Sequence, residues 1–492
     1  MEKNRRINKG KGGMTTLADE LQKQRKAVAK GARARDVVRV ALEVMVERVA
    51  DCRVAIMEVL AGAAKGRREL LLDLIGEEVE RVAEGCLSVP HYDPEAKTSQ
   101  EVFLFVGTHW KRVPGERFFL MVKECCRCMG VPKEKVNNPQ FMNEVYCSVA
   151  ARVARCWEPP VRPEGEAWLN LKNGTLEVDA LGMPRLRAHR KEDYMVNCLP
   201  FDYDAEADCP LWQEFLDRVL PDEGCQRVLR EYVANALVGG AVRLDVLLLL
   251  KGGGSNGKSV LLDVLGALAG RENVSNISLS DLTNDMQVRH GFEHKLLNTS
   301  SESESRWNAA VLKQLTSHEP VTVKWLYRNT YEMEDYGYLI AAVNEMPRAE
   351  ATNAFFRRMK ILPFDVTISH EEADPDLAEK LKGQLAGILN WFLRGLPGLL
   401  VRKKLSSSAV CDDELQNYRG MTDLVYWFVE ECCQRADNWE TGKNLFNRFG
   451  QFCQENALSS RLSSRRFYER LKGLNVQHSM RNHQNCFGLI LL

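Results

Sequence analysis

Residues 252–259 read Gly-Gly-Gly-Ser-Asn-Gly-Lys-Ser, which fits the pattern G-x4-G-K-[ST] of a phosphate-binding P-loop. The apolar stretch 244–250 comes directly before these residues and predicts a buried strand. Residues 260–265 come directly after them and predict the start of a helix. A strand, a glycine-rich turn and a helix in this order predict an α/β layer in which the helix N-terminus binds phosphate.

Each residue type in this loop has a physical role in binding a nucleotide. Glycines let the backbone N–H groups turn inward around the phosphates, and the lysine reaches the β- and γ-phosphates. The hydroxyl of Ser259 is a ligand for Mg²⁺. We therefore predict ATP and Mg²⁺ as cofactors, bound by Gly252, Gly253, Gly254, Ser255, Asn256, Gly257, Lys258 and Ser259. The alternative is a glycine-rich turn without a ligand, which the flanking strand and helix disfavour.

An acidic pair ends a second short strand. Residues 295–300 predict this strand, and Glu302 and Glu304 follow it. Two residues apart on an extended segment, the two carboxylates lie on the same side of the chain. Glu302 is our candidate for the Mg²⁺ shell, and the other carboxylate can orient or deprotonate water. Without the P-loop upstream, such a pair would indicate a solvated loop.

Polar side chains beside two further predicted strands can also act on the nucleotide phosphates. Residues 338–343 predict a strand with Asn344 at its carboxyl end, the edge at which open α/β sheets bind ligands. Asn344 can contact the γ-phosphate or the attacking water, and the alternative is a cap on the following turn. Arg357 and Arg358 precede a strand over 361–364. An arginine supplied to a neighbour's γ-phosphate accelerates phosphoryl transfer, although exposed arginines are otherwise common.

The order of predicted elements indicates several domains. A length of 492 residues corresponds to about three domains, and strands alternate with helices over 241–400, as in a parallel sheet covered by helices. We expect a multidomain α/β protein. We place a basic helical region at 1–95, an α-rich domain with a helical lead-in at 96–240, the P-loop core at 241–400, a polar linker at 401–417 and a compact domain at 418–492.

The overall composition excludes several classes of protein. The 67 Lys and Arg residues balance 67 Asp and Glu, and 45% of residues are hydrophobic, as in ordinary globular proteins. No apolar run approaches the ~18 residues that span a bilayer, and the polar residues 1–13 do not begin a signal peptide. We therefore expect a cytoplasmic protein with no membrane partner. The 15 cysteines lack zinc-site spacing and predict reduced thiols without a structural metal.

Charge is unevenly distributed along the chain. Residues 1–39 hold twelve Lys and Arg against four Asp and Glu. Such an arm can neutralise nucleic-acid phosphates, but a solvated helix face or a flexible tail has the same composition.

Four of these features, in this order, resemble the superfamily III helicases of the AAA+ class, in particular the phage, plasmid and poxvirus-type primase-helicases. Residues 252–259 resemble the Walker A motif of that family, and residues 300–304 resemble its Walker B motif. Residues 341–347 are similar to its sensor strand, and residues 355–364 are similar to its arginine-finger strand. The resemblance covers roughly residues 100–492 and is strongest over 165–365, so it implies an AAA+-type ATPase core.

The resemblance implies roles for individual side chains. It implies nucleotide roles for Lys258, Ser259, Glu302, Glu304 and Asn344. It favours Arg358, with Arg357 second, as the arginine that acts on the neighbouring subunit's nucleotide. Family members carry a pore β-hairpin where this chain has residues 321–328. Lys324 and Arg328 would then contact DNA phosphates, and Trp325 or Tyr327 could stack on bases.

The C-terminal segment resembles the winged-helix domain that ends many members of the family. Residues 444–449 and 463–472 predict two helices, and residues 476–491 predict a two-stranded wing. Arg465 and Arg466 would face the phosphates or groove edges of DNA. A winged helix that docks on protein is the alternative, because the fold alone does not determine the ligand.

Together these features predict a ring-forming, ATP-dependent replicative DNA helicase of a mobile element, phage or plasmid. We expect a hexamer that translocates on single-stranded DNA and acts on forked DNA. A separate primase is a candidate partner, because the chain lacks a clear cluster of acidic primase ligands ahead of the core. The alternative is an ATP-switched DNA-binding initiator or regulator that does not unwind. A P-loop kinase is disfavoured by the paired glutamates, Asn344 and the arginine strand.

Overall fold

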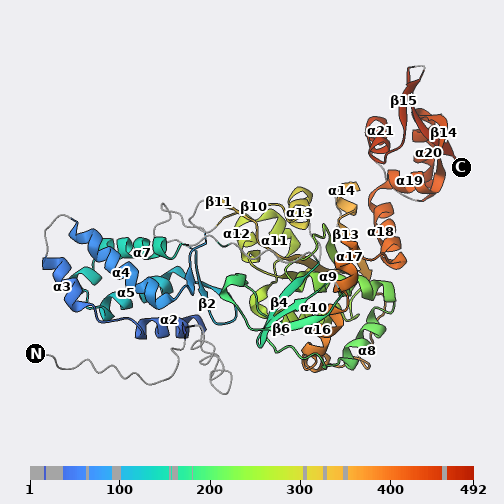
Figure 1. Ribbon diagram of the computed structural model, residues 1–492. Helices are drawn as coiled ribbons and strands as arrows, with labels where there is room; N and C mark the ends of the chain where they lie inside the picture. The colour runs from blue at the N-terminus through green and yellow to red at the C-terminus, as the bar shows by residue number, and fades with distance from the viewer. Residues whose placement is uncertain are drawn as a thin grey trace, which may run out of the picture. The chain divides into compact units, whose positions relative to one another are not determined.

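The computed structural model describes residues 16–17, 37–61, 66–90, 101–154, 157, 165–179, 181–302, 307–324, 330–346, 353–456, 462–481 and 483–492 (Figure 1). The chain divides into two compact units. The first comprises residues up to 162 together with 170–175 and 187–198, and the second comprises 163–169, 176–186 and 199–492. Within the described ranges, no helix combines the length and the apolar character that crossing a bilayer requires.

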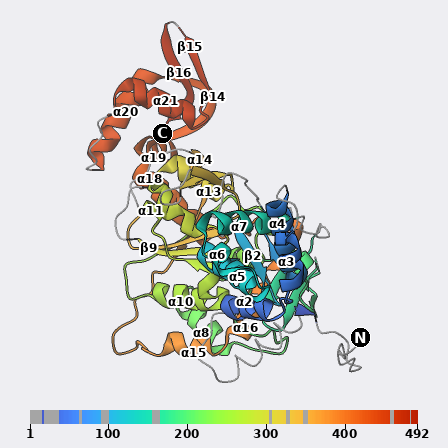
Figure 2. The same ribbon diagram turned by 90° about the vertical axis from the view of Figure 1, so that its left-hand side faces the viewer.

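The first unit is mostly helical, as the sequence predicts for the N-terminal region. Its helices are α2 (Val37–Glu47), α3 (Arg53–Ala61), α4 (Arg67–Ala83), α5 (Gly115–Cys128), α6 (Lys133–Val136) and α7 (Pro139–Arg152). A small antiparallel sheet of order β1-β2-β3 contains β1 (Leu87–Ser88), β2 (Val102–Phe105) and β3 (Trp110–Val113). Helices α4 and α7 lie side by side in both views (Figures 1 and 2). Val79, Phe118 and Tyr146 are buried in the core of this unit.

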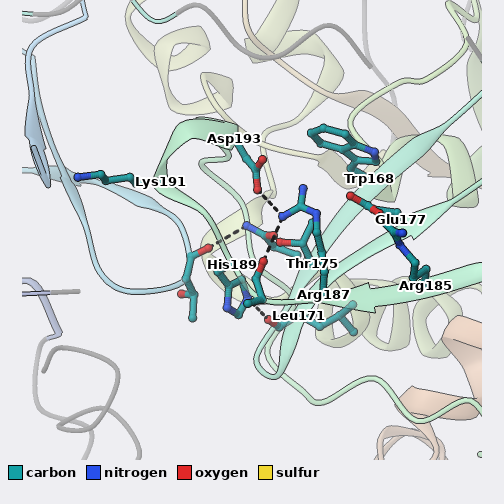
Figure 3. Close-up of polar contacts among 12 residues, drawn as sticks. Trp168, Leu171, Thr175, Glu177, Arg185, Arg187, His189, Lys191 and Asp193 are labelled. Carbon is teal, nitrogen blue, oxygen red and sulfur yellow. Dashed lines mark hydrogen bonds and ion pairs between the residues drawn. The ribbon is translucent and has the colours of Figure 1, made fainter. Parts of the chain in front are cut away.

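Polar side chains of the first unit are paired around residues 170–175 and 187–193. Strands β4 (Ala167–Leu171), β5 (Gly174–Val178) and β6 (Pro184–Arg187) form a sheet in that order. The buried Arg187 guanidinium donates to the buried carboxylate of Asp193 at 2.7 Å, and His189 Nε2 donates to Leu171 O at 2.8 Å (Figure 3). Buried ion pairs need additional hydrogen bonds to offset their desolvation, and Arg187 also donates to Ala188 O at 3.1 Å.

The second unit is built on a five-stranded parallel sheet. Its strands are β7 (Leu247–Lys251), β8 (Val274–Ser275), β9 (Leu297–Glu302), β12 (Tyr338–Val343) and β13 (Met359–Pro363), in the order β13-β7-β12-β9-β8. Strand β12 is buried along its whole length, as is β7 up to Leu250. Continuous apolar runs of this kind are typical of parallel strands that are covered on both faces. The predicted α/β class and parallel sheet are therefore confirmed.

Short helices and one hairpin complete this unit. The helices are α8 (Pro210–Val219), α9 (Glu223–Leu237), α10 (Lys258–Ala269), α11 (Leu279–Asn284), α12 (Met286–Arg289), α13 (Ala309–Thr316), α14 (Asn353–Phe356), α15 (Leu377–Lys382), α16 (Leu385–Leu393), α17 (Leu396–Arg402) and α18 (Ala409–Thr422). Strands β10 (Val321–Lys324) and β11 (Thr330–Met333) form an antiparallel hairpin.

The segment predicted as a polar linker, residues 401–417, is mostly helical. Helix α18 begins at Ala409, where the hydroxyl of Ser408 accepts a hydrogen bond from the backbone N–H of Cys411 at 3.3 Å. The helix buries Cys411 and Tyr418, although most of its side chains are polar. The prediction was wrong because this helix is held by two buried contacts and by ion pairs rather than by a broad apolar stripe.

Two of those ion pairs attach α18 to the sheet. Lys251, at the end of β7, donates to Glu414 at 2.6 Å. Lys360, on β13, donates to Asp412 at 2.8 Å. Helix α18 therefore docks beside β13 and is also held by an ion pair at the end of β7.

The last part of the chain has its own core. It comprises α19 (Leu424–Cys432), β14 (Cys433–Thr441), α20 (Gly442–Glu455), α21 (Ser464–Gly473), β15 (His478–Arg481) and β16 (Gln484–Leu491). The antiparallel sheet has the order β14-β16-β15, and buried aromatic rings of Phe428, Phe449, Phe452, Phe467 and Phe487 pack beside it. The two predicted helices and the two-stranded hairpin are confirmed as elements.

Candidate nucleotide site

The carboxyl ends of three neighbouring strands lie level at one edge of the parallel sheet. Val343, at the end of β12, is in register with Lys251 of β7 on one side and with Glu302 of β9 on the other. Neighbouring strands lie about 4.8 Å apart, so the backbones of Lys251 and Glu302 are about 10 Å apart. The P-loop, Asn344 and the predicted acidic segment therefore leave the sheet at the same edge.

The lysine of the P-loop is directed into the loop. Its Nζ donates to the backbone oxygen of Gly252 at 2.5 Å and to Oδ1 of Asn256 at 2.9 Å. Lys258 is buried, and this burial lowers the pKa of its ammonium group. Asn256 also donates to Phe364 O at 2.9 Å, which ties the loop to the end of β13. The positive charge is thus held at the position where the motif requires it to meet phosphate.

Two loop glycines are required by the geometry. Gly257 has φ +85°, and a Cβ there would lie 2.8 Å from Cγ1 of Val219. A Cβ at Gly252 would lie 2.4 Å from the backbone oxygen of Phe364. Only glycine fits these positions without displacing the chain. The loop is therefore a narrow cradle of backbone groups that ends at the N-terminus of α10, which suits a phosphate chain.

A cavity of about 690 Å³ opens beside the loop. Its polar side includes loop residues 254–260 together with Ser301 and Asn344. Its apolar side is formed by Leu211, Phe215, Val219, Ile368 and Leu377. Cavities of roughly 300–1,000 Å³ with a few polar groups are typical of small-molecule and cofactor sites.

The apolar wall was missed by the sequence analysis. Leu211, Phe215 and Val219 lie four residues apart on α8, so they share one face of that helix. This spacing was the available signal. It could not be assigned to a ligand without knowing that α8 lies beside the P-loop.

The residues predicted to act with the loop are partly described. Asn344 is exposed at the end of β12 and lines the cavity, as does Ser301 of β9. Strand β9 ends at Glu302. The side chain of Glu302 and all of Glu304 lie outside the described residues, so their predicted roles stay predictions.

The two predicted finger arginines have different environments. Arg358 is buried, and its guanidinium donates to the hydroxyl of Ser317 at 3.1 and 3.3 Å. Burial, and then the neighbouring charge of Arg357, lower the pKa of Arg358. Arg357 is exposed. The predicted finger role of the two arginines stays a prediction, and of the two only Arg357 has an exposed side chain.

Comparisons with known proteins match two segments of the chain to family models. Residues 92–221 match the family model described as D5 N terminal like, and residues 250–358 match a family of unknown function, DUF5906. These segments are typical of the primase-helicases of phages and viruses. The resemblance to superfamily III helicases is thereby confirmed.

Individual proteins are more distant. "Putative helicase 121R" of Invertebrate iridescent virus 3 is 22% identical over 319 residues, a match that covers 56% of this chain and 33% of that protein. The chain therefore matches about a third of the length of this curated relative. The apo structure of the NrS-1 C-terminal region is 12% identical with a TM-score of 0.43, covering 80% of this chain and 95% of that one. A second structure of that region, residues 305–718, has a TM-score of 0.36 at 12% identity and covers 66% and 96%.

The antiparallel pair β10–β11 lies between β9 and β12 in the chain, and its predicted role as a DNA-contacting hairpin stays a prediction. Val323 and Met333 are buried at its base. Arg289 is also buried and donates to Thr322 O at 2.6 Å, which fastens α12 to the hairpin. Lys324 is half-buried at the end of β10. The predicted DNA contact Arg328, with Trp325 and Tyr327, lies outside the described residues.

The two C-terminal arginines predicted to bind DNA, Arg465 and Arg466, are exposed on α21. Ser463 caps that helix by accepting a hydrogen bond from the backbone N–H of Arg466 at 3.4 Å. Arg465 pairs with Glu469 at 3.3 Å on the surface, where such a pair contributes little stability. Arg470 instead donates to the buried carboxylate of Asp423 at 2.7 Å. Arg465 and Arg466 are thus exposed to solvent, whereas Arg470 of the same helix stabilises the fold.

Proposed function

We propose that this chain is an ATP-dependent DNA helicase that assembles as a hexameric ring and translocates on single-stranded DNA. The observation that carries the proposal is that Lys251, Val343 and Glu302 are in register. The three strands that contain them therefore end at the same edge of the sheet. It supports a single site that combines the P-loop, Asn344 and the acidic segment. The confirmed likeness to superfamily III helicases supports the choice of DNA as the substrate.

The residues that line the cavity are chemically suited to binding a nucleotide. The loop backbone and Lys258 would hold the phosphates, and the hydroxyl of Ser259 would ligate Mg²⁺. Phe215 and Val219 would hold the base against an apolar surface. When bound, ATP with Mg²⁺ supplies the phosphoryl group whose transfer to water drives the motor. Lys258 would exchange its bonds to Gly252 and Asn256 for bonds to phosphate.

The remaining catalytic groups would come from two subunits. Asn344 and one of the glutamates would orient the attacking water, and Glu302 would complete the Mg²⁺ shell. Arg357 would reach the nucleotide of the neighbouring subunit, where it would stabilise the charge that develops on the phosphoryl oxygens. Its exposed position supports this role, whereas the buried Arg358 would position the strand that carries it.

Hydrolysis would be coupled to DNA through the hairpin and the C-terminal domain. Lys324 and Arg328 of each subunit would contact phosphates of the strand inside the ring. The order helix–strand–helix–helix–strand–strand in residues 424–491 supports a winged helix, with Arg465 and Arg466 on its DNA-facing helix. This domain and the basic N-terminal arm would recruit the ring to DNA.

A second candidate function is an ATP-switched DNA-binding initiator that does not unwind. The exposed arginines of α21 support it, because they suit duplex binding whether or not a strand is pulled through a ring.

Unwinding of a forked duplex with ATP and Mg²⁺ tests the helicase directly, beside native mass measurement of the assembly. Strand separation by wild type, its loss in Lys258→Ala and a hexameric mass are the expected results. ATP-dependent DNA binding without strand separation would favour the initiator.

A further inference from the structure

Two cysteines far apart in the sequence meet where two helices begin. The sulfur of Cys225 lies 3.4 Å from the sulfur of Cys411, and both residues are fully buried. Asp222 caps α9 and Ser408 caps α18, and the hydroxyl of Ser408 donates to Oδ1 of Asp222 at 3.0 Å. Each cysteine is the third residue of its helix. The two helix N-termini therefore converge on a pair of thiols.

The two thiols have unequal acidities. A hydrogen bond from Cys225 lowers the pKa of Cys411 despite its burial, and Ser408 and the charge of Lys360 act in the same direction. The same hydrogen bond, together with burial, raises the pKa of Cys225. Partial positive charge at a helix N-terminus also favours a thiolate. The lower pKa of Cys411 favours this residue as the thiol that reacts first.

Cys411 lies in α18, so a bond at this cysteine would change how firmly that helix is held. Helix α18 leads directly into the C-terminal part of the protein, and non-covalent contacts, including two ion pairs, hold it beside β7 and β13. We propose that Cys225 and Cys411 form a reversible disulfide that fastens α18 to α9. This inference does not rest on the helicase proposal, because it concerns two thiols outside the nucleotide cavity.

The reaction balances with a peroxide as the oxidant. The Cys411 thiolate attacks one peroxide oxygen, the O–O bond breaks, and a sulfenic acid and one water form after protonation. The Cys225 sulfur then attacks the Cys411 sulfur, the S–O bond breaks, and a second water leaves as the S–S bond forms. Two thiols are oxidised and one hydrogen peroxide is reduced to two waters. A dithiol reductant reverses the process by two exchange steps.

The test uses the full chain, reduced, desalted and then exposed to hydrogen peroxide without denaturant. A non-reduced digest is analysed by mass spectrometry, and free thiols are counted after denaturation. We expect a peptide that links Cys225 to Cys411, about tenfold more abundant than any other linked pair, and its loss on adding dithiothreitol. Absence of this peptide while other thiols oxidise would overturn the proposal, as would equal amounts of unrelated linked pairs.

Variants separate the pair from general thiol reactivity. Cys411→Ser and Cys225→Ala should abolish the linked peptide, whereas Cys453→Ser, which removes another buried thiol, should leave its yield unchanged. Circular dichroism confirms that each variant is folded. Phenylarsine oxide, which bridges two close thiols, gives an independent readout. It should protect the pair from peroxide in the wild type, and failure to bind there would contradict the proposed proximity.

Discussion

The guanidinium of Arg358 donates two hydrogen bonds to the hydroxyl of Ser317, 41 residues earlier in the same chain. In the proposed ring, the exposed Arg357 would reach a neighbouring subunit more readily than the buried Arg358. We therefore predict that Arg357→Ala lowers the kcat of ATP hydrolysis by roughly 10³-fold with little change in stability. Arg358→Ala should instead cost about 1–3 kcal/mol of unfolding free energy. Steady-state ATPase assays and urea unfolding measure the two effects.

Mixed assemblies provide the control for this assignment. Arg357→Ala subunits mixed with Lys258→Ala subunits should recover part of the ATPase activity, because some interfaces then contain an intact lysine and an intact arginine. Each variant is also assayed alone. The finger role would return to Arg358 if Arg358→Ala subunits were folded but inactive alone and regained activity with Lys258→Ala subunits, while Arg357→Ala subunits stayed active alone.

The hairpin is anchored by one buried side chain. Arg289 donates to the backbone oxygens of Leu282, Thr283 and Thr322 at 2.6–3.0 Å. Arg289→Leu leaves these oxygens without a donor and should cost about 3 kcal/mol, with faster amide hydrogen exchange in β10 and β11. Lys324→Ala is the matched variant. It should change stability by less than about 0.5 kcal/mol yet uncouple ATP hydrolysis from strand separation. Normal unwinding by Lys324→Ala would remove the hairpin from the mechanism.

The half-buried His318 should make stability depend on pH. Burial, and then the charge of Arg243, lower the pKa of His318, whose ring packs against Tyr336 and Tyr338. In the unfolded chain histidine titrates near about 6.5, so below that pH the unfolded state binds more protons than the folded state. The stabilising contribution is complete above pH ~6.5 and is lost as the pH falls through the folded pKa.

Urea unfolding at about pH 7.5 and about pH 5.5 measures this dependence. His318→Asn is the control, because asparagine does not titrate and tolerates the φ of +48° at this position. The variant should lose less stability than wild type between the two pH values. An equal loss in both proteins would assign the dependence to other groups.

The arginines of helix α21 should have two separate roles, one in DNA binding and one in folding. Replacing Arg465 and Arg466 by alanine should weaken binding to all DNA sequences and reduce the salt dependence of log K by about 2. Arg470→Ala should instead leave the buried carboxylate of Asp423 without its partner and cost about 3 kcal/mol. Fluorescence anisotropy across a salt series and thermal unfolding distinguish the two outcomes. An unchanged salt slope in the double variant would place the DNA contact elsewhere.

The sheet and its loop could be predicted because short stretches of sequence indicate each of them without contacts to distant residues. The apolar run before Gly252 forms β7, and the G-K-S sequence begins α10 where the motif requires it. The strand order could not be read in the same way. β12 pairs between β7 and β9 although it follows both in the chain, and only this pairing brings Val343 level with Lys251.

Other features depend on contacts between distant residues. The burial of Arg358 requires Ser317, and the docking of α18 requires Lys251 and Lys360, so residue type alone indicates neither contact. The apolar wall of the cavity required α8 to pack beside the loop, which the amphipathic spacing of Phe215 and its neighbours does not specify.

ATP turnover in the presence of single-stranded DNA, compared between wild type and Lys258→Ala, tests the nucleotide site most directly. The ammonium of Lys258 is buried in the loop beside Gly252 and Asn256. We predict DNA-stimulated hydrolysis by wild type and a loss of at least about 100-fold in the variant, with its assembly intact. Undiminished turnover by a folded Lys258→Ala protein would contradict the assignment of this loop as the motor's ATP site.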